Sequence, residues 1–382
     1  MTKKKGNLKE IALVFFRMGC FAFGGPAAHI AMMDEEIIQK RKWMSRQHFL
    51  DLIGATNLIP GPNSTEMTMH SGHERGGIPG LFVAGIAFIL PAVVITGFLA
   101  YLYVEYGSLP DVKPFITGIK PAVLAVIAGA ILKLGKKALK SWELGVLGGL
   151  VVITSLMPNT NEVLVLLCAG LLGAFYFYFK NNLNSKSKGD GKKMFAFGLL
   201  AVPSSIGSKV LATTIFWKFL KVGAILYGSG YVLFAYLDAE LVETGLLSRQ
   251  ELMDAIAVGQ FTPGPVLSTA TFIGYQLGGF GGALAASAGI FLPSFLFVLL
   301  LNPLIPKMRQ SKFLSGFLDS VNVAAVGIML AVLVGMGQES VFGWRTGVIA
   351  AISCFFTFGP WKLNAMWIIL GGSVLGFLLF KI

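Results

Sequence analysis

The sequence has little charge and almost no cysteine. Charged residues make up 13% of its 382 positions, whereas 55% are hydrophobic. Together with a mean hydropathy of +0.73, these values are typical of an integral membrane protein built from helices. The cysteines Cys20, Cys168 and Cys354 lie far apart in apolar runs, and no CxxC motif is present. This spacing argues against a disulfide framework or a zinc site.

Motifs of nucleotide chemistry and covalent catalysis are also missing. The chain has no Gly-x-x-x-x-Gly-Lys-Ser/Thr motif, so by itself it should not hydrolyse ATP. Neither a metal-ligand cluster nor a nucleophile–base arrangement is visible. We therefore expect no enzyme activity, no metal and no cofactor. A membrane enzyme or scaffold is the alternative from a different class.

Basic residues outnumber acidic ones by 31 to 19, which gives a net charge of +12. Most of the Lys and Arg residues lie in short loops between apolar segments. This pattern indicates orientation by the positive-inside rule and not nucleic-acid binding. The basic N-terminus is not followed by a small-residue cleavage site, so the first apolar segment should be retained. We expect a multi-pass protein of the cell membrane, with monomer and homodimer both open.

Two sets of apolar segments lie on either side of a polar linker. The first set lies near residues 11–33, 49–72, 78–104, 115–135, 144–157 and 163–179. The second lies near 209–236, 250–276, 280–301, 313–337, 341–358 and 363–380, after a short apolar piece near 194–206. We predict an all-α polytopic protein with about six helical segments in each half. The expected division is a first repeat at 1–179, a flexible linker at 180–193 and a second repeat at 194–382.

The second half repeats the first. Residues 15–19 match 219–223, and residues 45–47 match 248–250. Further matches are Asp34 with Asp238, Glu36 with Glu240, Asp51 with Asp254, Leu90-Pro91 with Leu292-Pro293, Trp142 with Trp344 and Pro158 with Pro360. The register holds across most of each half. This is a two-fold repeat of whole bundles, not a short-period solenoid.

Loop charges predict that the two repeats are inverted. The acidic loop at 105–111 corresponds to a basic loop at 307–312, and the basic loop at 136–140 corresponds to an acidic one at 338–340. Opposite bias at matching loops means that the halves insert upside down relative to each other. The segment at 11–33 has basic flanks on both sides, so it either crosses the membrane or enters and returns near residues 24–26. The piece at 194–206 is a candidate for the odd crossing.

A Pro-Gly-Pro break interrupts one apolar segment of each repeat, at 60–62 and at 263–265. Such breaks free backbone groups inside the bilayer, where they must be buried in protein or line a polar cavity. The helix after each break points its N-terminal amides at the break, which favours an anion. A kink that only aids packing is the alternative. The residues predicted to bind the substrate at these breaks and at the neighbouring glycine turns are Gly24, Gly25, Asn57, Gly61, Asn63, Ser64, Gly228, Ser229, Gln260, Thr262, Gly264 and Ser268.

Two cations occupy equivalent positions inside apolar segments. Arg17 and Lys221 each stand two residues before a glycine. An intramembrane cation is costly and normally faces a cavity, a partner or a substrate. Snorkelling to the interface is the alternative. A divalent oxyanion between them would neutralise both, so we predict that Arg17 and Lys221 bind the substrate. Lys120 also lies in an apolar run, but its counterpart is Asn322, so the repeat does not support it.

Titratable residues near the first break are candidates for proton coupling. Glu66 follows the break, and its counterpart is Thr269, so it departs from the symmetry. His29 lies near the first glycine turn, and histidine titrates easily near neutral pH. We predict that Glu66 and His29 couple protons to transport. Asp51 and Asp254 are expected to belong to a structural network at the interface.

Several of these motifs together resemble the chromate ion transporter family. The resemblance rests on Phe23-Gly24-Gly25-Pro26-Ala27-Ala28-His29-Ile30, on residues 57–62, on residues 260–265 and on Phe291-Leu292-Pro293-Ser294. It covers nearly the whole chain and resembles the two-domain, long-chain type. It implies export of chromate, with sulfate as a similar dianion, driven by the membrane potential or a proton gradient. Uptake or exchange of sulfate or another oxyanion is the alternative. Many members carry Gln where this chain has Asn57, so the resemblance marks this position for selectivity.

Overall fold

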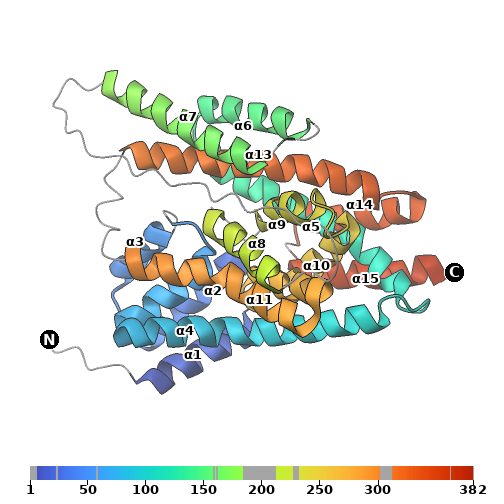
Figure 1. Cartoon of the computed structure of the whole chain (residues 1–382), viewed down its shortest axis with the longest axis horizontal. Coiled ribbons are helices and arrows are strands. Elements are labelled where there is room, and N and C mark those ends of the chain that lie inside the picture. Colours follow the sequence, from blue (N-terminus) through green and yellow to red (C-terminus); the bar gives the residue numbers. More distant parts are fainter. Residues whose placement is uncertain are drawn as a thin grey trace.

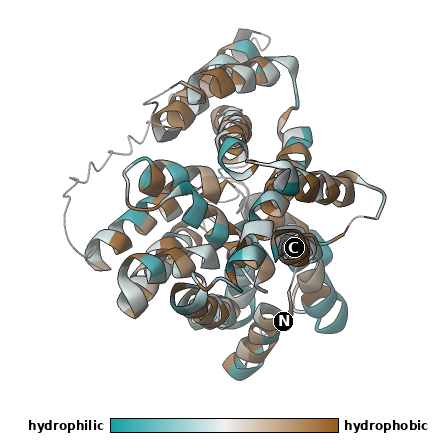
Figure 2. Ribbon diagram, turned by 90° about the vertical axis from the view of Figure 1, so that its right-hand side faces the viewer, coloured by the Kyte–Doolittle hydropathy of each residue, from teal (hydrophilic) through white to brown (hydrophobic). Residues whose placement is uncertain are grey.

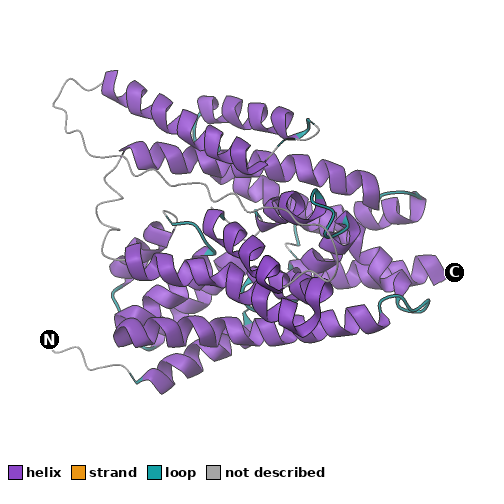
Figure 3. Cartoon of the chain, viewed as in Figure 1, coloured by secondary structure: helices purple, strands orange, loops and turns teal. Residues whose placement is uncertain are grey.

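The computed structural model describes residues 7–22, 25–56, 59–157, 160, 162–183, 212–226, 232–301, 312–361 and 363–381. These residues form helices joined by short loops, and they contain no strand (Figure 3). The first-half helices are α1 (Leu8–Phe21), α2 (Gly25–Met33), the π-helix η1 (Asp34–Lys40), α3 (Arg46–Thr56), α4 (Asn63–Tyr106), α5 (Lys113–Ala138), α6 (Trp142–Ser155) and α7 (Glu162–Leu183). Those of the second half are α8 (Ala212–Ile225), α9 (Leu233–Leu237), the π-helix η2 (Asp238–Val242), α10 (Arg249–Phe261), the 3-10 helix η3 (Val266–Ser268), α11 (Thr269–Leu301), α13 (Lys312–Ser340), α14 (Trp344–Phe358) and α15 (Ala365–Lys381).

Four stretches in the described chain are long and apolar enough to cross a membrane. They are Asn63–Tyr106, Lys113–Ala138, Val266–Leu300 and Ser315–Ser340. Large apolar side chains such as Phe82, Ile86 and Val94 are exposed along α4, as expected where a helix faces lipid. Seen along the bundle, most helices carry hydrophobic residues (Figure 2). The prediction of an all-α polytopic membrane protein is confirmed.

The two longest helices are in fact hairpins. Gly72 lies so close to Gly80 and Ala84 that a Cβ on Gly72 would clash with both. In a straight helix Gly72 and Gly80 would be about 12 Å apart, so the chain folds back. The turn lies at Gly77, whose positive φ of 64° suits a glycine. In α11 the same reversal occurs at Gly279, with φ 61°, and Gly274 lies against Gly282.

The short helices before α4 also enter and return at one end of the molecule. Glu10 at the start of α1 pairs with Arg41, just after η1, at 3.6 Å and with Arg75 in α4 at 3.3 Å. His48 near the start of α3 lies 3.5 Å from Glu74. The segment at 11–33 is therefore a hairpin of two short helices and not one straight helix. Its connection at 23–24 lies outside the described residues.

The second half has the same order of elements and a matching ion pair. Arg46 lies 3.5 Å from Asp34, and the equivalent Arg249 lies 2.9 Å from Asp238. Both pairs join the π-helix to the start of the helix that leads into a break. The halves are also interlocked, because α4 packs on α11, α7 on α13 and α5 on α15 (Figure 1). Gly61 and Gly264, the glycines of the two breaks, are both buried.

Candidate functional site at the two helix breaks

The first break separates α3 from α4. Gly61 has φ 138°, a conformation that side chains disfavour. Its N–H donates to the carbonyl of Leu226 at 2.6 Å, at the end of α8 in the other half. The flanking Pro60 and Pro62 cannot donate, so Gly61 provides the single backbone donor of the Pro-Gly-Pro motif.

The second break makes the reciprocal contact. Gly264 has φ 89°, and its N–H donates to the carbonyl of Ala22, which follows α1, at 3.0 Å. Ala22 is the repeat counterpart of Leu226. Each break is therefore held by the end of the opposite half's first helix. The two glycine amides, predicted to face an anion, are occupied by carbonyls in this conformation.

His29 connects the two breaks. Its Nε2 lies 3.1 Å from the Ala22 carbonyl, and its Nδ1 lies 3.1 Å from the hydroxyl of Ser64. Because a carbonyl only accepts, Nε2 carries the hydrogen and Nδ1 accepts from Ser64 in the neutral ring. A continuous chain of hydrogen bonds thus runs from Ser64 through His29 and Ala22 to Gly264.

Glu66 is a buried group at the first break whose hydrogen-bonding capacity is not satisfied in the described chain. Its side chain is completely buried, and neither carboxyl oxygen has a hydrogen-bond partner in the described chain. A Cβ on Gly61 would clash with the Glu66 carboxyl group and would lie 2.8 Å from Oγ of Ser294. The Ser294 hydroxyl is buried and likewise lacks a described partner. Unsatisfied buried polar groups are rare in proteins and mark strain, function or an absent ligand.

The second break has an apolar version of the same arrangement. There the wall beside Gly264 is the methyl group of Ala92, which a Cβ on Gly264 would approach to 2.9 Å. Ala92 is the counterpart of Ser294, and Thr269 is the counterpart of Glu66. The hydroxyl of Thr269 bonds to the carbonyl of Val266 at 2.8 Å. The polar pair Glu66 and Ser294 therefore occurs at one break only.

Other predicted residues line the second break as buried polar groups. Ser268 is fully buried and accepts from the Thr96 hydroxyl at 3.1 Å. Gln260 is buried, and its Nε2 lacks a partner in the described chain. The hydroxyl of Thr262 donates a hydrogen bond to the carbonyl of Val258 at 3.0 Å. At the first break, the buried hydroxyl of Thr65 also lacks a described partner.

The two predicted cations lie elsewhere. Arg17 is exposed on the outer face of α1, whereas its neighbours Phe15 and Met18 face the core. Lys221 is 39% exposed and forms an ion pair with Glu240. Neither is among the buried polar groups at the breaks, so their role in binding stays a prediction.

The remaining predicted residues are placed only in part. Asn63 begins α4 and is half-buried, and Gly25 begins α2. Gly24, Asn57, Gly228 and Ser229 lie outside the described residues, as do most of the linker and the piece at 194–206.

Sequence reasoning did not select Ser294 or Thr96. A signal existed for Ser294, because the Leu-Pro pairs at 90–91 and 292–293 repeat while the next residue changes from Ala92 to Ser294. Thr96 had no such signal, because its partner Ser268 is 172 positions away.

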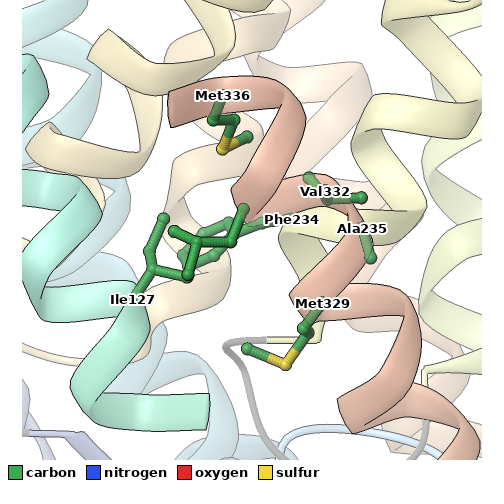
Figure 4. Close-up of a pocket in the computed structure, with 7 residues that line it drawn as sticks. Ile127, Phe234, Ala235, Met329, Val332 and Met336 are labelled. Carbon is green, nitrogen blue, oxygen red and sulfur yellow. The ribbon is translucent and has the colours of Figure 1, made fainter. Parts of the chain in front are cut away.

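A cavity elsewhere in the bundle is apolar. It lies between α5, α9 and α13 and is lined by Ile127, Phe234, Ala235, Met329, Val332, Leu333 and Met336 (Figure 4). With these apolar linings it offers an oxyanion no charge or hydrogen bond. The part of the chain that the structure describes contains no group of three or more His, Cys, Asp or Glu side chains that could hold a metal ion.

A multi-pass helical protein with a broken helix in each half has the architecture of a transporter. The chromate transporter family model matches residues 9–174 and 213–377. The chain therefore belongs to the chromate transporter family, a family of transporters and not of enzymes. The resemblance seen in the sequence is thus confirmed, and its motifs at 23–30, 57–62, 260–265 and 291–294 lie within the matched residues.

Relatives of full and half length are similar to the chain. A probable chromate transport protein of Synechococcus elongatus is 30% identical over 94% of this chain and 91% of its own length. The chromate transport protein of Cupriavidus metallidurans is 28% identical over 97% and 92%. The uncharacterized transporter YwrB of Bacillus subtilis is 28% identical over 49% of this chain and 96% of its own length. No solved structure matches the chain.

Proposed function

We propose that the protein exports chromate across the cytoplasmic membrane by alternating access, with the two helix breaks as its binding site. The observation that carries the proposal is the reciprocal pair of bonds from Gly61 to Leu226 and from Gly264 to Ala22. The proposal is also supported by relatives that are named chromate transport proteins. Chromate is a tetrahedral dianion, and sulfate-like dianions should fit the same donors.

The two halves insert in opposite orientations in this proposal. The re-entrant helix pairs of the first half, α1 with α2 and α3 with the first arm of α4, begin and finish at one end of the bundle. This end carries the basic residues Lys40, Arg41, Arg46 and Arg75, so by the positive-inside rule it should face the cytoplasm. The corresponding helix pairs of the second half begin at the opposite end of the bundle. There Lys120, near the start of α5, lies 3.4 Å from Gln250 at the start of α10. Rocking one half against the other would then open the breaks to one side at a time.

In this proposal, the described conformation corresponds to an occluded state of the cycle. Thr65, Glu66, Ser268 and Thr269 are all fully buried. Opening one side breaks a glycine–carbonyl bond and releases an amide donor next to unsatisfied side-chain groups. Released amides, Thr65, Ser294 and Gln260 then donate hydrogen bonds to the anion, since each has a hydrogen to offer.

Glu66 supplies the proton coupling. A buried carboxyl group without a partner is costly when ionised, and an ionised Glu66 would repel a dianion. The neutral form donates a hydrogen bond instead, so anion binding favours protonation of Glu66. His29 holds Ser64 of the same break and joins it to the second break, which couples the two sites geometrically.

The membrane potential favours export. With a cytoplasm negative by about 100 mV, moving a dianion outward gains about 5 kcal/mol, at about 2.3 kcal/mol per charge. A proton carried outward on Glu66 together with the anion reduces this gain to about 2.3 kcal/mol, so the membrane potential still drives export. Uptake would instead need several co-transported cations. Sulfate uptake or exchange is the competing function.

The deciding experiment uses purified protein in liposomes, with chromate and sulfate tested separately while potential and pH are varied independently. Export of chromate that increases with an inside-negative potential supports the proposal. Sulfate uptake or one-for-one exchange that ignores the potential would replace it with the competing function. Absence of flux for both anions would refute both.

A further inference from the structure

A buried ion pair lies between α4, α5 and α10, away from the two breaks. Nζ of Lys120 is 3.5 Å from Oδ2 of Asp254 and 3.4 Å from Oε1 of Gln250. The hydroxyl of Tyr103 donates to the same Asp254 oxygen at 2.7 Å. Only 5% of the Asp254 side chain and 15% of the Lys120 side chain are exposed. These charges are thus largely removed from solvent.

The ion pair is loosely made. An ammonium group has three hydrogens to donate, and good charge-assisted bonds are about 2.7–2.9 Å long. Both contacts of Lys120 are longer than that. Oδ1 of Asp254 is buried without a hydrogen-bond partner in the described chain. A buried charge pair stabilises a protein only when its remaining groups are satisfied, so stability alone does not account for this one.

The pair lies on the way from the second break to one end of the bundle. Thr96 bonds to Ser268 at the break, and Tyr103 follows Thr96 on α4 by seven residues, or about 10 Å. Asp254 precedes the end of α10 at Phe261 by the same seven residues. Both helices therefore place the pair about 10 Å from the break, toward the loop at 107–112. In the proposed topology that loop is external.

The lysine has no equivalent in the other half. Its counterpart on α13 is Asn322, which is neutral. A packing role shared by both repeats would not require a charge on one side only. The two other charged residues at the start of α10 have their own partners. Glu251 caps α10 with Ser248, and Arg249 binds Asp238 and Glu339.

We infer that Lys120 is an anion ligand on the external part of the transport path and that Asp254 is its resting counter-ion. This inference rests on the proposed function and adds a binding position beyond the breaks. An oxyanion that leaves the second break takes over the ammonium group from Asp254, which keeps its hydrogen bond from Tyr103. When the anion has left, Lys120 returns to Asp254. The Lys120 ammonium group is thereby paired with an anion in both states, and the Tyr103 hydroxyl stabilises Asp254 while the oxyanion is bound.

The test measures the half-saturating chromate concentration separately at each face, with right-side-out and inverted membrane vesicles in exchange mode. We expect Lys120→Gln to raise the external value about tenfold or more, since a bond to a charged group is lost. Lys120→Arg should restore the external value to within about threefold, and Asp254→Asn should lower it about threefold, because the competing carboxylate is gone. The internal value should stay the same in all three.

A matched control is Lys140→Gln, which removes a cation that pairs with Asp319 at 2.6 Å on the exposed surface. It should change neither value. Equal changes at both faces, or no change with Lys120→Gln, would overturn the inference. If Asp254→Asn fails to insert, Tyr103→Phe replaces it. That variant leaves Asp254 dependent on Lys120, so the external value should rise, and an unchanged value counts against the inference.

A binding assay tests the inference about Lys120 independently of the proposed transport function. If the wild-type protein moves neither anion, chromate-dependent thermal stabilisation of the detergent-purified protein still reports binding. A smaller stabilisation in Lys120→Gln than in wild type and Lys140→Gln supports the anion ligand. The same stabilisation in all three overturns it.

Discussion

Gly264 donates its N–H to the carbonyl of Ala22 at 3.0 Å, across an interval of more than two hundred residues. This bond joins the second helix break to the end of the first helix of the chain. His29 shares the same carbonyl and passes the connection on to Ser64. In the proposed alternating-access cycle, movement of one half relative to the other would break this bond and open the second break.

The break glycines are the first test of the site. Alanine at Gly61 or Gly264 is strained at their positive φ values and collides with Glu66 or Ala92. We expect chromate flux to fall at least about tenfold in each variant, because a strain of about 1–3 kcal/mol displaces the break. Flux should be measured per amount of inserted protein. Gly337→Ala is the control, since a Cβ there meets open space, and it should keep normal flux.

Glu66→Gln tests proton coupling. The carboxamide resembles the neutral carboxyl group in shape and keeps a donor, but it does not titrate. We expect chromate transport to persist and its dependence on pH to disappear, which a pH series at constant potential would measure. Unchanged pH dependence would remove Glu66 from the coupling. Thr269→Val at the symmetric position of the second break should leave the pH profile unaltered.

The pair Ser294→Ala and Ala92→Ser separates the two breaks. Loss of the Ser294 hydroxyl removes one hydrogen bond to the anion, worth about 0.5–1.5 kcal/mol. The half-saturating chromate concentration should therefore rise about two- to tenfold. Ala92→Ser adds a hydroxyl at the equivalent place and should not weaken binding. Equal effects of the two substitutions would contradict the polar asymmetry.

Substitution of Arg17 and Lys221 tests whether these two cations bind the anion. If they form the predicted cation pair around the anion, replacement of either by Gln abolishes transport. Arg17 is exposed and Lys221 pairs with Glu240, which also has Lys218 at 3.7 Å. If instead Lys221 acts only through its ion pair with Glu240 and Arg17 acts only on the outer face of α1, both variants keep chromate flux within about threefold, since exposed ion pairs contribute little. Loss of flux in both, with normal insertion, would restore the sequence-based prediction.

Two symmetric ion pairs should differ in stability. Arg249→Gln leaves Asp238, only 3% exposed, without its arginine and should lower the free energy of unfolding by about 3–5 kcal/mol. Arg46→Gln removes a cation that is 70% exposed, and the expected loss is below about 1 kcal/mol. Thermal unfolding in detergent would compare the two. Similar losses would mean that burial does not set the energetics of these pairs.

The sequence by itself determined the class of protein, the repeat and the positions of the breaks. Apolar segments of membrane length require helices, because backbone groups in lipid must bond within their own segment. The breaks could be located because proline and glycine act locally on the backbone. The asymmetry between Glu66 and Thr269 was visible for the same reason, since aligned repeats can be compared residue by residue.

Only the tertiary structure decided which groups meet. Gly61 bonds to Leu226, Glu66 lies near Ser294, and Lys120 lies next to Asp254, each across more than a hundred residues. The apolar pattern identifies a buried face but does not choose the partner that covers it. The exposure of Arg17 likewise depended on which side of α1 packs against α4, and an isolated charge in an apolar run leaves that side open.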